Sequence, residues 1–380
     1  MTSDASKTFP IAPNGTVGIL GGGQLGRMLA LAAARLGLRV HIYADSPDGP
    51  AEQCAAAVTV GDYRDAATLE AFAKAVDVVT YEFENVPAET VEILEKAGVS
   101  AAPGARPLAV AQDRLAEKDF MRSLGAGVAP YAAVDDVDNL AAAASKIGLP
   151  AILKTRRFGY DGKGQVRLDE TADASAFEAA LQSIAGAPAI LEGFVPFACE
   201  ISVVGARGRD GASVLFDPAR NDHAGGILRR SRVPADAPTA SLDAAREITL
   251  KALDALDYVG VLAVEFFVLP DGAVLVNEFA PRVHNSGHWT QDACVCDQFE
   301  QHIRAVCGWP LGDGARHSDA DMANLIGDDV HSWRALAATP DTAVHLYGKS
   351  EARDGRKMGH ATRIFAIEEG ADTTFNTRPA

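Results

Sequence analysis

The first hundred residues alternate between short apolar runs and longer segments whose apolar residues recur at helical spacing. The apolar runs have the length of buried strands, and the segments between them have the period of helices that cover a core. The strand candidates are residues 16–20, 39–44 and 77–83, and the helix candidates are residues 25–37, 66–76 and 87–98. Because strands and helices alternate at this spacing, the pattern predicts a parallel sheet with helices on both faces.

The pattern changes after a Pro/Gly-rich break at residues 101–109 and an amphipathic helix predicted over residues 111–125. Beyond it, short strands joined by Gly or Asp turns surround two helices, near 137–147 and 172–184. The strand candidates are residues 150–156, 164–168, 189–195, 199–207 and 212–218, followed by a hairpin over 259–282. This pattern is typical of an α+β domain.

The chain therefore divides into predicted domains of different classes. We expect a disordered tail at residues 1–15, an α/β, Rossmann-like domain over 16–115 and the α+β domain over 116–310. The residues after Pro310 carry short strands and no long helix, so we expect a small β-rich C-terminal domain over 311–380.

Composition places the chain among ordinary globular proteins and limits its partners. It has 380 residues, of which 48% are hydrophobic and 23% charged. The formal net charge of −16 argues against a nucleic-acid partner, because binding to phosphate backbones relies on basic patches. No apolar run approaches the ~18 residues of a membrane span, and no signal-peptide pattern opens the chain. We therefore expect no membrane partner. The five cysteines are scattered without a zinc-binding pattern, so we expect reduced thiols and a cytoplasmic location.

The first strand–helix–strand unit carries a glycine motif that supports more than one ligand. Gly21, Gly23 and Gly26 have GxGxxG spacing, and Asp45 ends the second apolar run. These are the parts of a dinucleotide site: a tight turn, a phosphate at a helix N-terminus and an acid for the ribose. The motif decides little by itself, because other phosphates can use the same glycines and helix N–H groups.

The hairpin over 259–282 carries an acid on each arm. Glu265 and Glu278 lie on paired strands, with Asn277 beside the second acid. Two carboxylates and a carboxamide form a set of hard oxygen ligands that suits Mg²⁺. The alternative is that Glu265 faces solvent, but it lies inside an apolar run, where an unpaired charge is costly to bury.

A basic, glycine-rich loop follows Lys154. Gly159, Gly162 and Gly164 separate this lysine from the next strand. Glycines let backbone N–H groups approach phosphate oxygens, and the lysine adds a positive charge, so the loop is a candidate phosphate site. The loop lacks the spacing of a Walker motif, and a flexible hairpin turn is the alternative.

Further polar clusters follow along the chain. The backbone after Glu192 and the carboxylate of Glu200 are weak candidates for an adenine edge and ribose hydroxyls, and the Gly-rich turn at His223 is as easily a surface loop. Directly after the second hairpin acid come the donors that an anionic intermediate needs, Arg282, His284, Asn285, Ser286 and His288. A second cationic turn, explained either by a substrate phosphate or by solvent, contains Lys349, Arg356 and Lys357.

The order of these features resembles the ATP-grasp superfamily, in which ATP lies between two α+β subdomains and drives formation of an acyl phosphate. Within it, "GGGQLGRM", "GYDGKGQ", "NEFAPRVHNSGHWTQ" and "GRKMGH" are similar to the 5-(carboxyamino)imidazole ribonucleotide synthases of purine biosynthesis. The resemblance covers about residues 16 to 365. It implies a Rossmann-like first domain, a two-part ATP-grasp domain and a small β-rich C-terminal domain.

The resemblance implies an ATP-dependent ligase that forms a carbon–nitrogen bond. ATP, bicarbonate and 5-aminoimidazole ribonucleotide would give the N-carboxylated ribonucleotide, ADP and phosphate by way of carboxyphosphate. It also implies Mg²⁺, which Mn²⁺ can replace, and a homodimer. The glycine motif would then close over the ribonucleotide, whose phosphate takes the place of the dinucleotide phosphate, and the loop at 156–164 would be a lid.

The resemblance also assigns roles to individual positions. ATP-binding positions are matched by Arg114, Lys154, Gly159, Tyr160, Asp161, Gly162, Lys163, Gly164, Gln165, Glu192, Gly193, Phe194, Val195, Glu200, His223, Asn277 and Glu278. Ribonucleotide positions are matched by Gly23, Gln24, Leu25, Glu82, Lys349, Arg356 and Lys357. The Mg²⁺ ligands are matched by Glu265 and Glu278. The expected catalytic positions are Arg282, His284, Asn285, Tyr160, Asp161 and Lys163.

Three other hypotheses compete with this one. Another ATP-grasp ligase, such as a formate-using ribonucleotide transformylase, is disfavoured by the "HNSGHWT" segment. A nicotinamide-dependent dehydrogenase explains residues 17–46 but leaves both hairpin acids without a role. An inactive homologue would have lost a metal acid or Lys154, and both acids and the lysine are present.

Overall fold

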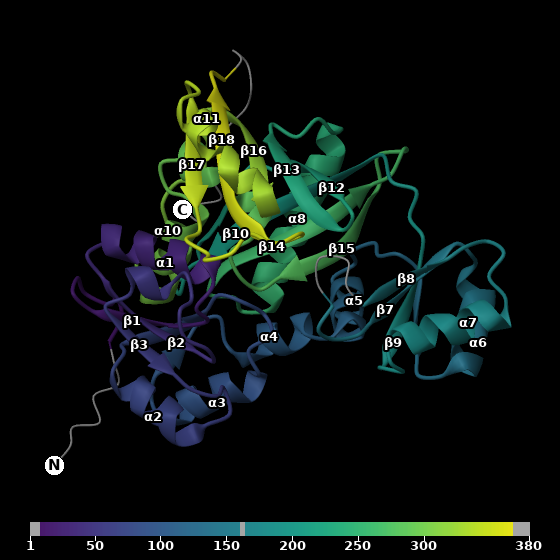
Figure 1. The fold of residues 1–380 in the computed structure, drawn as a ribbon, viewed down its shortest axis with the longest axis horizontal. Helices are drawn as coiled ribbons and strands as arrows, with labels where there is room; N and C mark the ends of the chain where they lie inside the picture. Colours follow the sequence, from purple (N-terminus) through teal and green to yellow (C-terminus); the bar gives the residue numbers. More distant parts are fainter. Residues whose placement is uncertain (1–7, 160–163, 368–380) are drawn as a thin grey trace.

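The computed structural model describes residues 8–159 and 164–367, which are arranged around three sheets (Figure 1). The N-terminal sheet has strand order β3-β2-β1-β4-β5, and its pairings are parallel. Its strands are β1 (Thr16–Leu20), β2 (Arg39–Ala44), β3 (Ala57–Val60), β4 (Val78–Tyr81) and β5 (Ser100–Ala101). Its helices are α1 (Gln24–Arg35), α2 (Ala66–Lys74), α3 (Ala88–Lys96) and α4 (Ala105–Ala111).

Helices cover both faces of this sheet, as the apolar pattern predicts. Side chains alternate along a strand, so Ile19 packs into the core that contains Leu29 of α1, whereas its neighbour Leu20 packs into the core that contains Phe72 of α2. Both strand residues are fully buried. The carboxyl ends of β1 and β4 therefore meet at one edge, which carries the glycine motif and the segment after Tyr81.

A smaller lobe lies beside this domain, at the right of Figure 1. Its four-stranded antiparallel sheet has the order β6-β9-β7-β8. The strands are β6 (Tyr131–Val134), β7 (Ala151–Thr155), β8 (Gln165–Leu168) and β9 (Ala189–Gly193), and the helices are α6 (Val137–Ile147) and α7 (Ala174–Ser183). Helix α5 (Arg114–Ser123) leads into the lobe from the N-terminal domain.

The third sheet is the largest and runs through the centre of the molecule (Figure 1). Its order is β15-β14-β10-β12-β13-β16-β18-β17, with β11 paired to β10. The strands are β10 (Cys199–Arg207), β11 (Ser213–Leu215), β12 (Ala219–Ala224), β13 (Ile227–Val233), β14 (Gly260–Val268), β15 (Val274–Ala280), β16 (Asp319–Ile326), β17 (Thr342–Leu346) and β18 (Lys357–Phe365). The helices are α8 (Thr239–Ala255), α9 (Thr290–Ala293), α10 (Gln298–Cys307) and α11 (Trp333–Ala337).

The structure corrects the sequence prediction in several places. The Pro/Gly-rich break at 101–109 contains most of α4, because Pro107 lies in the first turn, where its missing N–H is not needed. The pattern analysis did not predict α8 or the edge strand β3. The Gly-rich turn at His223 belongs to a hairpin of β12 and β13, which turns at Gly225 and Gly226 with positive φ.

The C-terminal strands continue the large sheet. Strand β16 pairs with β13 and β18 pairs with β16, so the residues after 310 share one sheet with β10 and β14. The domain limits at 115 and 310 stay predictions. Within residues 8–159 and 164–367, no helix combines the length and apolar character that crossing a membrane requires.

Candidate active site

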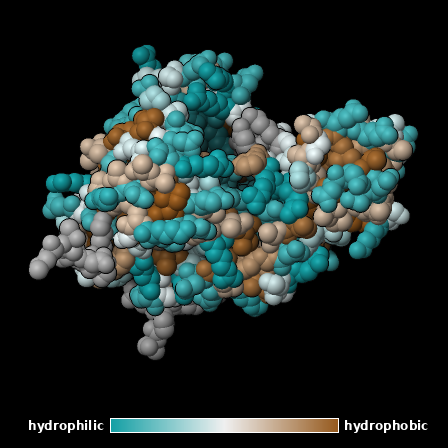
Figure 2. Space-filling model, turned by 90° about the horizontal axis from the view of Figure 1, so that it is seen from below, coloured by the Kyte–Doolittle hydropathy of each residue, from teal (hydrophilic) through white to brown (hydrophobic). Residues whose placement is uncertain are grey.

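A cavity of about 390 Å³ lies where these parts meet. Its walls come from the edge of the N-terminal sheet, α5, the β14–β15 hairpin, the segment after β15 and the start of β18. Figure 2 shows hydrophilic residues around a hollow on this side of the molecule. The lining includes the predicted positions Gln24, Leu25, Glu82, Arg114, Gly159, Glu265, Glu278, Arg282, His284, Asn285 and Lys357.

The two hairpin acids lie opposite one another. Glu265 of β14 is the register partner of Glu278 of β15, and a bulge follows Glu265. Burial, then the neighbouring Glu278 carboxylate, raises the pKa of Glu265. Burial acts the same way on Glu278, but Arg114, whose NH1 lies 2.9 Å from Oε2, outweighs it and lowers the pKa of Glu278. The arrangement holds one firmly ionised acid beside one whose ionisation a cation would favour.

This acid pair fits a Mg²⁺ ion that also binds substrate. In the described part of the chain, no group of three or more His, Cys, Asp or Glu residues is placed to hold a metal ion. Mg²⁺ is commonly held by one or two carboxylates together with substrate phosphates and water. Glu265 and Glu278 satisfy that pattern, and a divalent cation between them would relieve the repulsion of two close carboxylates.

In the smaller lobe, Lys154 of β7 and Glu192 of β9 form a partly buried ion pair. Nζ of Lys154 lies 3.0 Å from Oε2 of Glu192, and Nζ of Lys118 lies 3.5 Å from the same oxygen. Burial lowers the pKa of Lys154. Burial would raise the pKa of Glu192, but the two lysines outweigh it and the pKa is lowered. The second carboxylate oxygen of Glu192 is buried without a hydrogen-bond partner in the described structure.

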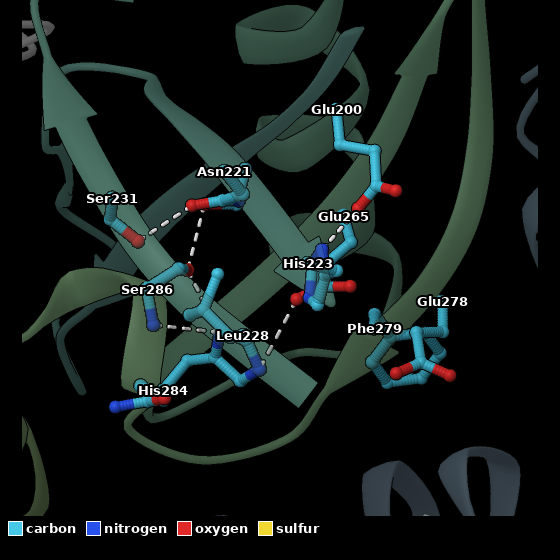
Figure 3. Close-up of polar contacts among 12 residues, drawn as sticks. Glu200, Asn221, His223, Leu228, Ser231, Glu265, Glu278, Phe279, His284 and Ser286 are labelled. Carbon is cyan, nitrogen blue, oxygen red and sulfur yellow. Dashed lines mark hydrogen bonds and ion pairs between the residues drawn. The ribbon is translucent and has the colours of Figure 1, made fainter. Parts of the chain in front are cut away.

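Glu200 and His223 face each other from neighbouring strands and form an ion pair (Figure 3). Burial would lower the pKa of His223, but Glu200 reverses the effect and raises it. Figure 3 places this pair beside Glu265 of β14, and Glu278 lies on the neighbouring strand β15. The structure therefore brings these four predicted residues together.

The predicted backbone contacts after Glu192 are partly used within the protein. The N–H of Gly193 donates to Pro130 at 2.8 Å, and the N–H of Phe194 donates to Pro150 at 3.0 Å. Val195 follows them and is buried. At the other end of the loop, the carbonyl of Gly164 accepts from Thr155 N–H at 2.8 Å, and Gln165 begins β8. Tyr160, Asp161, Gly162 and Lys163 lie outside the described residues.

The histidine after β15 is held in a defined tautomer. Nδ1 of His284 accepts the backbone N–H of Ser286 at 3.3 Å and lies 2.8 Å from its hydroxyl. A backbone amide can only donate, so the neutral ring carries its proton on Nε2, which lies 3.5 Å from Oε1 of Glu265. Burial, then Arg282, lowers the pKa of His284 to about 3. His284 is therefore a neutral N–H donor at the cavity wall.

Arg282 and Asn285 are tied to residues that the sequence did not suggest. The guanidinium of Arg282 pairs with Glu84, which follows β4. The amides of Asn285 and Asn324 bond reciprocally, at 2.9 and 2.7 Å. Both residues were expected at catalytic positions, and both line the cavity while held by these partners.

Two N–H groups of the glycine motif are already bonded within the protein. The N–H groups of Gly23 and Gly26 donate to the buried carboxylate of Glu82. A Cβ added at Gly23 would lie 2.5 Å from Oε1 of Glu82, so the glycine is needed for this approach. Burial raises the pKa of Glu82 although both N–H groups favour its charged form. Two of the amides that a dinucleotide or ribonucleotide phosphate would use are thereby occupied within the protein, whereas Gln24 and Leu25 at the start of α1 line the cavity.

The cationic turn before β18 is only partly inside the cavity. Lys357 lines the cavity, whereas Lys349 and Arg356 lie outside its wall. Nζ of Lys349 donates to the carbonyl of Lys357 at 2.7 Å, and its charge lowers the pKa of the Glu82 carboxyl, though burial raises that pKa more. Arg356 donates to the carbonyl of Glu351 at 2.9 Å.

Sequence reasoning missed several polar residues at the cavity and beside it. Glu117 and Lys118 lie on α5, where the amphipathic pattern gave no sign that two charged side chains are buried. Glu117 accepts the N–H of Phe279 at 2.6 Å, and Lys118 donates to the carbonyl of Asn277 at 2.6 Å. Glu84 was overlooked although it lies two residues after Glu82 in "TYEFEN".

Comparison with known proteins covers the described fold from end to end. Residues 15–112 match a ribonucleotide synthetase preATP-grasp domain, residues 119–299 match an ATP-grasp domain, and residues 320–372 match a phosphoribosylaminoimidazole carboxylase C-terminal domain. The chain thus carries the three segments in the order that the sequence resemblance implies.

Whole-chain relatives agree with these domain matches. The N5-carboxyaminoimidazole ribonucleotide synthase of Brucella melitensis is 53% identical over 357 residues, covering 93% of this chain and 97% of the relative. A crystal structure of an N5-carboxyaminoimidazole ribonucleotide synthetase in complex with ADP has a TM-score of 0.89 at 40% identity, covering 93% of each chain. The Aspergillus clavatus enzyme in complex with ADP and 5-aminoimidazole ribonucleotide has a TM-score of 0.86 at 29% identity, covering 93% of this chain and 94% of that one. The chain therefore belongs to the N5-carboxyaminoimidazole ribonucleotide synthase family of ATP-grasp ligases.

Proposed function

We propose that this enzyme carboxylates the amine of 5-aminoimidazole ribonucleotide with bicarbonate, at the expense of ATP, to give N5-carboxyaminoimidazole ribonucleotide, ADP and phosphate. The observation that carries the proposal is a single cavity lined by the acid pair Glu265 and Glu278 together with Arg282 and His284. A site for phosphoryl transfer and a site for an oxyanion are thus adjacent. An enzyme that forms an acyl phosphate and consumes it in the same cavity requires this arrangement.

We assign the nucleotide to the side of the cavity between the lobe and the large sheet. Lys154 and Arg114 supply positive charge near the phosphates, and Glu200 with His223 suits the ribose hydroxyls. Since the N–H groups of Gly193 and Phe194 are already bonded, the backbone of Val195 is our candidate for the contact with the adenine edge. The remaining predicted ATP contacts, including those of residues 160–163, stay proposals.

The metal would be held by Glu265 and Glu278. A Mg²⁺ or Mn²⁺ ion held there would supply positive charge to neutralise the phosphate oxygens during phosphoryl transfer. Arg114 keeps Glu278 ionised for this task, because the ion pair lowers the pKa of that carboxyl after burial has raised it. The nearby charge of Arg114 is also available to the departing phosphate oxygens.

In the first chemical step, an oxygen of bicarbonate attacks the γ-phosphorus, and the bond from that phosphorus to the ADP oxygen breaks. The product is carboxyphosphate, whose carboxylate and phosphate oxygens need fixed donors. Arg282 is a partly buried cation and the Nε2–H of His284 is a neutral donor, so the two stabilise negative charge without adding a titratable proton.

In the second step, the C–O bond of carboxyphosphate breaks to give carbon dioxide and phosphate. The ribonucleotide amine then attacks the carbon, and the proton that it loses leaves with phosphate or solvent. Glu82 borders the same cavity, and burial raises the pKa of its carboxyl, so we place the amine near it. Lys357, which lines the cavity, is our candidate ligand of the ribonucleotide phosphate. Lys349 and Arg356, outside the cavity wall, belong to the same cationic turn.

The assembly and location of the enzyme are also proposals. The homodimer is implied by the family resemblance, the cytoplasmic location is expected from the cysteine usage, and the domain limits at 115 and 310 come from the sequence pattern. Gel filtration with light scattering tests the dimer directly.

The test of the proposed function is release of ADP with ATP, Mg²⁺, bicarbonate and the ribonucleotide added in all combinations. We expect fast ADP release, and carbon-14 incorporation from bicarbonate into an acid-labile product, only when all four are present. ADP release that is indifferent to the ribonucleotide, together with absent incorporation, would refute the proposal.

A further inference from the structure

The segment after β4 carries an acid that contacts the arginine of the proposed bicarbonate site. Nε and NH2 of Arg282 both donate to the carboxylate of Glu84, and the NH2 bond to Oε1 measures 2.9 Å. The side chains are mostly shielded from solvent, with exposed fractions of 16% for Arg282 and 29% for Glu84. A bidentate pair of this kind fixes the plane of the guanidinium as well as its charge.

The remaining donors of Arg282 define the edge that is left for a ligand. A guanidinium has five N–H groups. Two donate to Glu84, and one on NH1 donates to the carbonyl of Val283 at 3.1 Å. Among the described residues these bonds leave one N–H on NH1 and one on NH2, the two nitrogens of the end fork, which match two oxygens of a planar anion. Arg282 lines the cavity, so this fork is available there.

Glu84 has the largest electrostatic effect of the acids near Arg282. Burial lowers the pKa of Arg282, but Glu84 and, to a smaller extent, Glu278 and Glu82 raise it. Of the three acids, Glu84 is the one that bonds the guanidinium directly.

Glu84 is itself held by the segment that opens α5. Nε2 of Gln112 donates to the carbonyl of Glu84 at 2.8 Å and to that of Val86 at 2.6 Å. Two residues later, Arg114 binds Glu278. One short segment therefore supports the acid that aims Arg282 and supplies the cation that holds Glu278.

We propose that Glu84 is a positioning residue that aims the end fork of Arg282 at bicarbonate and carboxyphosphate across the interface between the N-terminal domain and the large sheet. The inference rests on the proposed function. It predicts that Glu84 acts on the bicarbonate half of the reaction while leaving the binding of ATP and of the ribonucleotide almost unchanged.

The test compares Glu84→Gln with the wild-type enzyme in steady-state kinetics, varying each substrate separately. Displacing a reacting group by about 1 Å costs on the order of 100-fold in rate, so we expect kcat to fall roughly 10- to 100-fold. The KM for bicarbonate should rise several-fold, whereas the KM values for ATP and ribonucleotide should change less than about twofold. Glu84→Asp, which keeps the charge but shortens the reach, should show a smaller loss of the same kind and serves if Glu84→Gln fails to fold.

Arg35→Gln is the matched control. Arg35 of α1 also pairs across domains, with Asp297 at 3.0 Å and with Glu300, but away from the cavity. We expect Arg35→Gln to change Tm by a similar amount and to leave kcat and the KM for bicarbonate unchanged. If Glu84→Gln changes Tm and leaves every kinetic constant as in Arg35→Gln, Glu84 is only a structural contact and the inference is wrong.

A double-mutant comparison separates positioning from direct action. In an Arg282→Gln background there is no guanidinium to aim, so adding Glu84→Gln should cost less than about twofold more. An equal further loss in both backgrounds would show that Glu84 acts independently of Arg282 and would overturn the inference. Failure of the proposed function is distinct, because the wild-type enzyme itself would then show no bicarbonate- and ribonucleotide-dependent ADP release.

Discussion

Replacing Lys118 by methionine removes a buried cation that joins three elements around the nucleotide side of the cavity. Its side chain on α5 is 2% exposed, and Nζ contacts the carbonyl of Asn277 at 2.6 Å and Oε2 of Glu192 at 3.5 Å. Methionine fills a similar volume, so the loss is one of charge and hydrogen bonding rather than of packing.

The structure sets the magnitude of that loss. A hydrogen bond to a charged group contributes about 1.5–3 kcal/mol, and this applies to the contact with Asn277. Breaking a buried ion pair typically costs about 3–5 kcal/mol, but Glu192 keeps Lys154 at 3.0 Å, so only a part of that cost applies. We expect Lys118→Met to lose about 2–3 kcal/mol of unfolding free energy. At an unfolding entropy of about 2.1 cal/mol/K per residue over the 380 residues of the chain, Tm should fall by roughly 2–4 °C.

The same contacts predict a kinetic effect. Asn277 and Glu192 belong to the proposed ATP site, and Lys118 fixes both, so its loss should raise the KM for ATP roughly 10-fold, equivalent to about 1.4 kcal/mol. Differential scanning fluorimetry and ATP titrations of ADP release measure the two effects. Lys251→Met is the control, because Lys251 pairs with Glu247 on the exposed face of α8, and its Tm should not change. Equal Tm and equal KM in Lys118→Met and Lys251→Met would refute the reasoning.

Three further predictions follow from the cavity. Glu278→Gln should lower kcat on the order of 100-fold, because it removes a metal carboxylate and unpairs Arg114, and near-normal rates at limiting Mg²⁺ would mean that the metal site is misplaced. Arg356→Ala should mainly raise the KM for ribonucleotide, whereas Arg282→Ala should depress kcat at saturating substrates, and the reverse pattern would exchange their roles. Burial raises the pKa of Glu117 to about 8, so the folded state binds a proton that the unfolded state has released between roughly pH 4.5 and 8. Stability should therefore fall as pH rises through this window, and urea titrations of Glu117→Gln should show a flatter profile; an identical profile would exclude Glu117 as its source.

Local pattern was sufficient for most of the elements. The predicted strands at 16–20, 39–44 and 199–207 agree with the structure residue for residue, because continuous apolar runs must be buried and short runs are buried as strands. The pattern analysis missed α8, and it overlooked α4 because Pro107 was taken as a break rather than as a first-turn residue.

The candidate site, too, was predicted from the sequence only in part. Glu265 and Glu278 were predicted to face each other because a hairpin turn fixes the register of its arms, and they are register partners. The glycine motif predicted a phosphate at a helix N-terminus, yet Glu82, 59 residues from Gly23, occupies its N–H groups. Nothing local to the motif indicates that competitor.

What the sequence by itself determined is most of the elements, the paired acids of one hairpin and the family, because each depends on residues that are close along the chain or on motifs quoted whole. What only the tertiary structure decided is which charges are paired. Arg282 meets Glu84 across 198 residues, and Lys118 reaches Asn277 across 159 residues. Charged side chains near a cavity are compatible with several partners at the level of sequence. Only the packing of the N-terminal sheet, α5 and the β14–β15 hairpin against one another selects the partner that lies within hydrogen-bond distance.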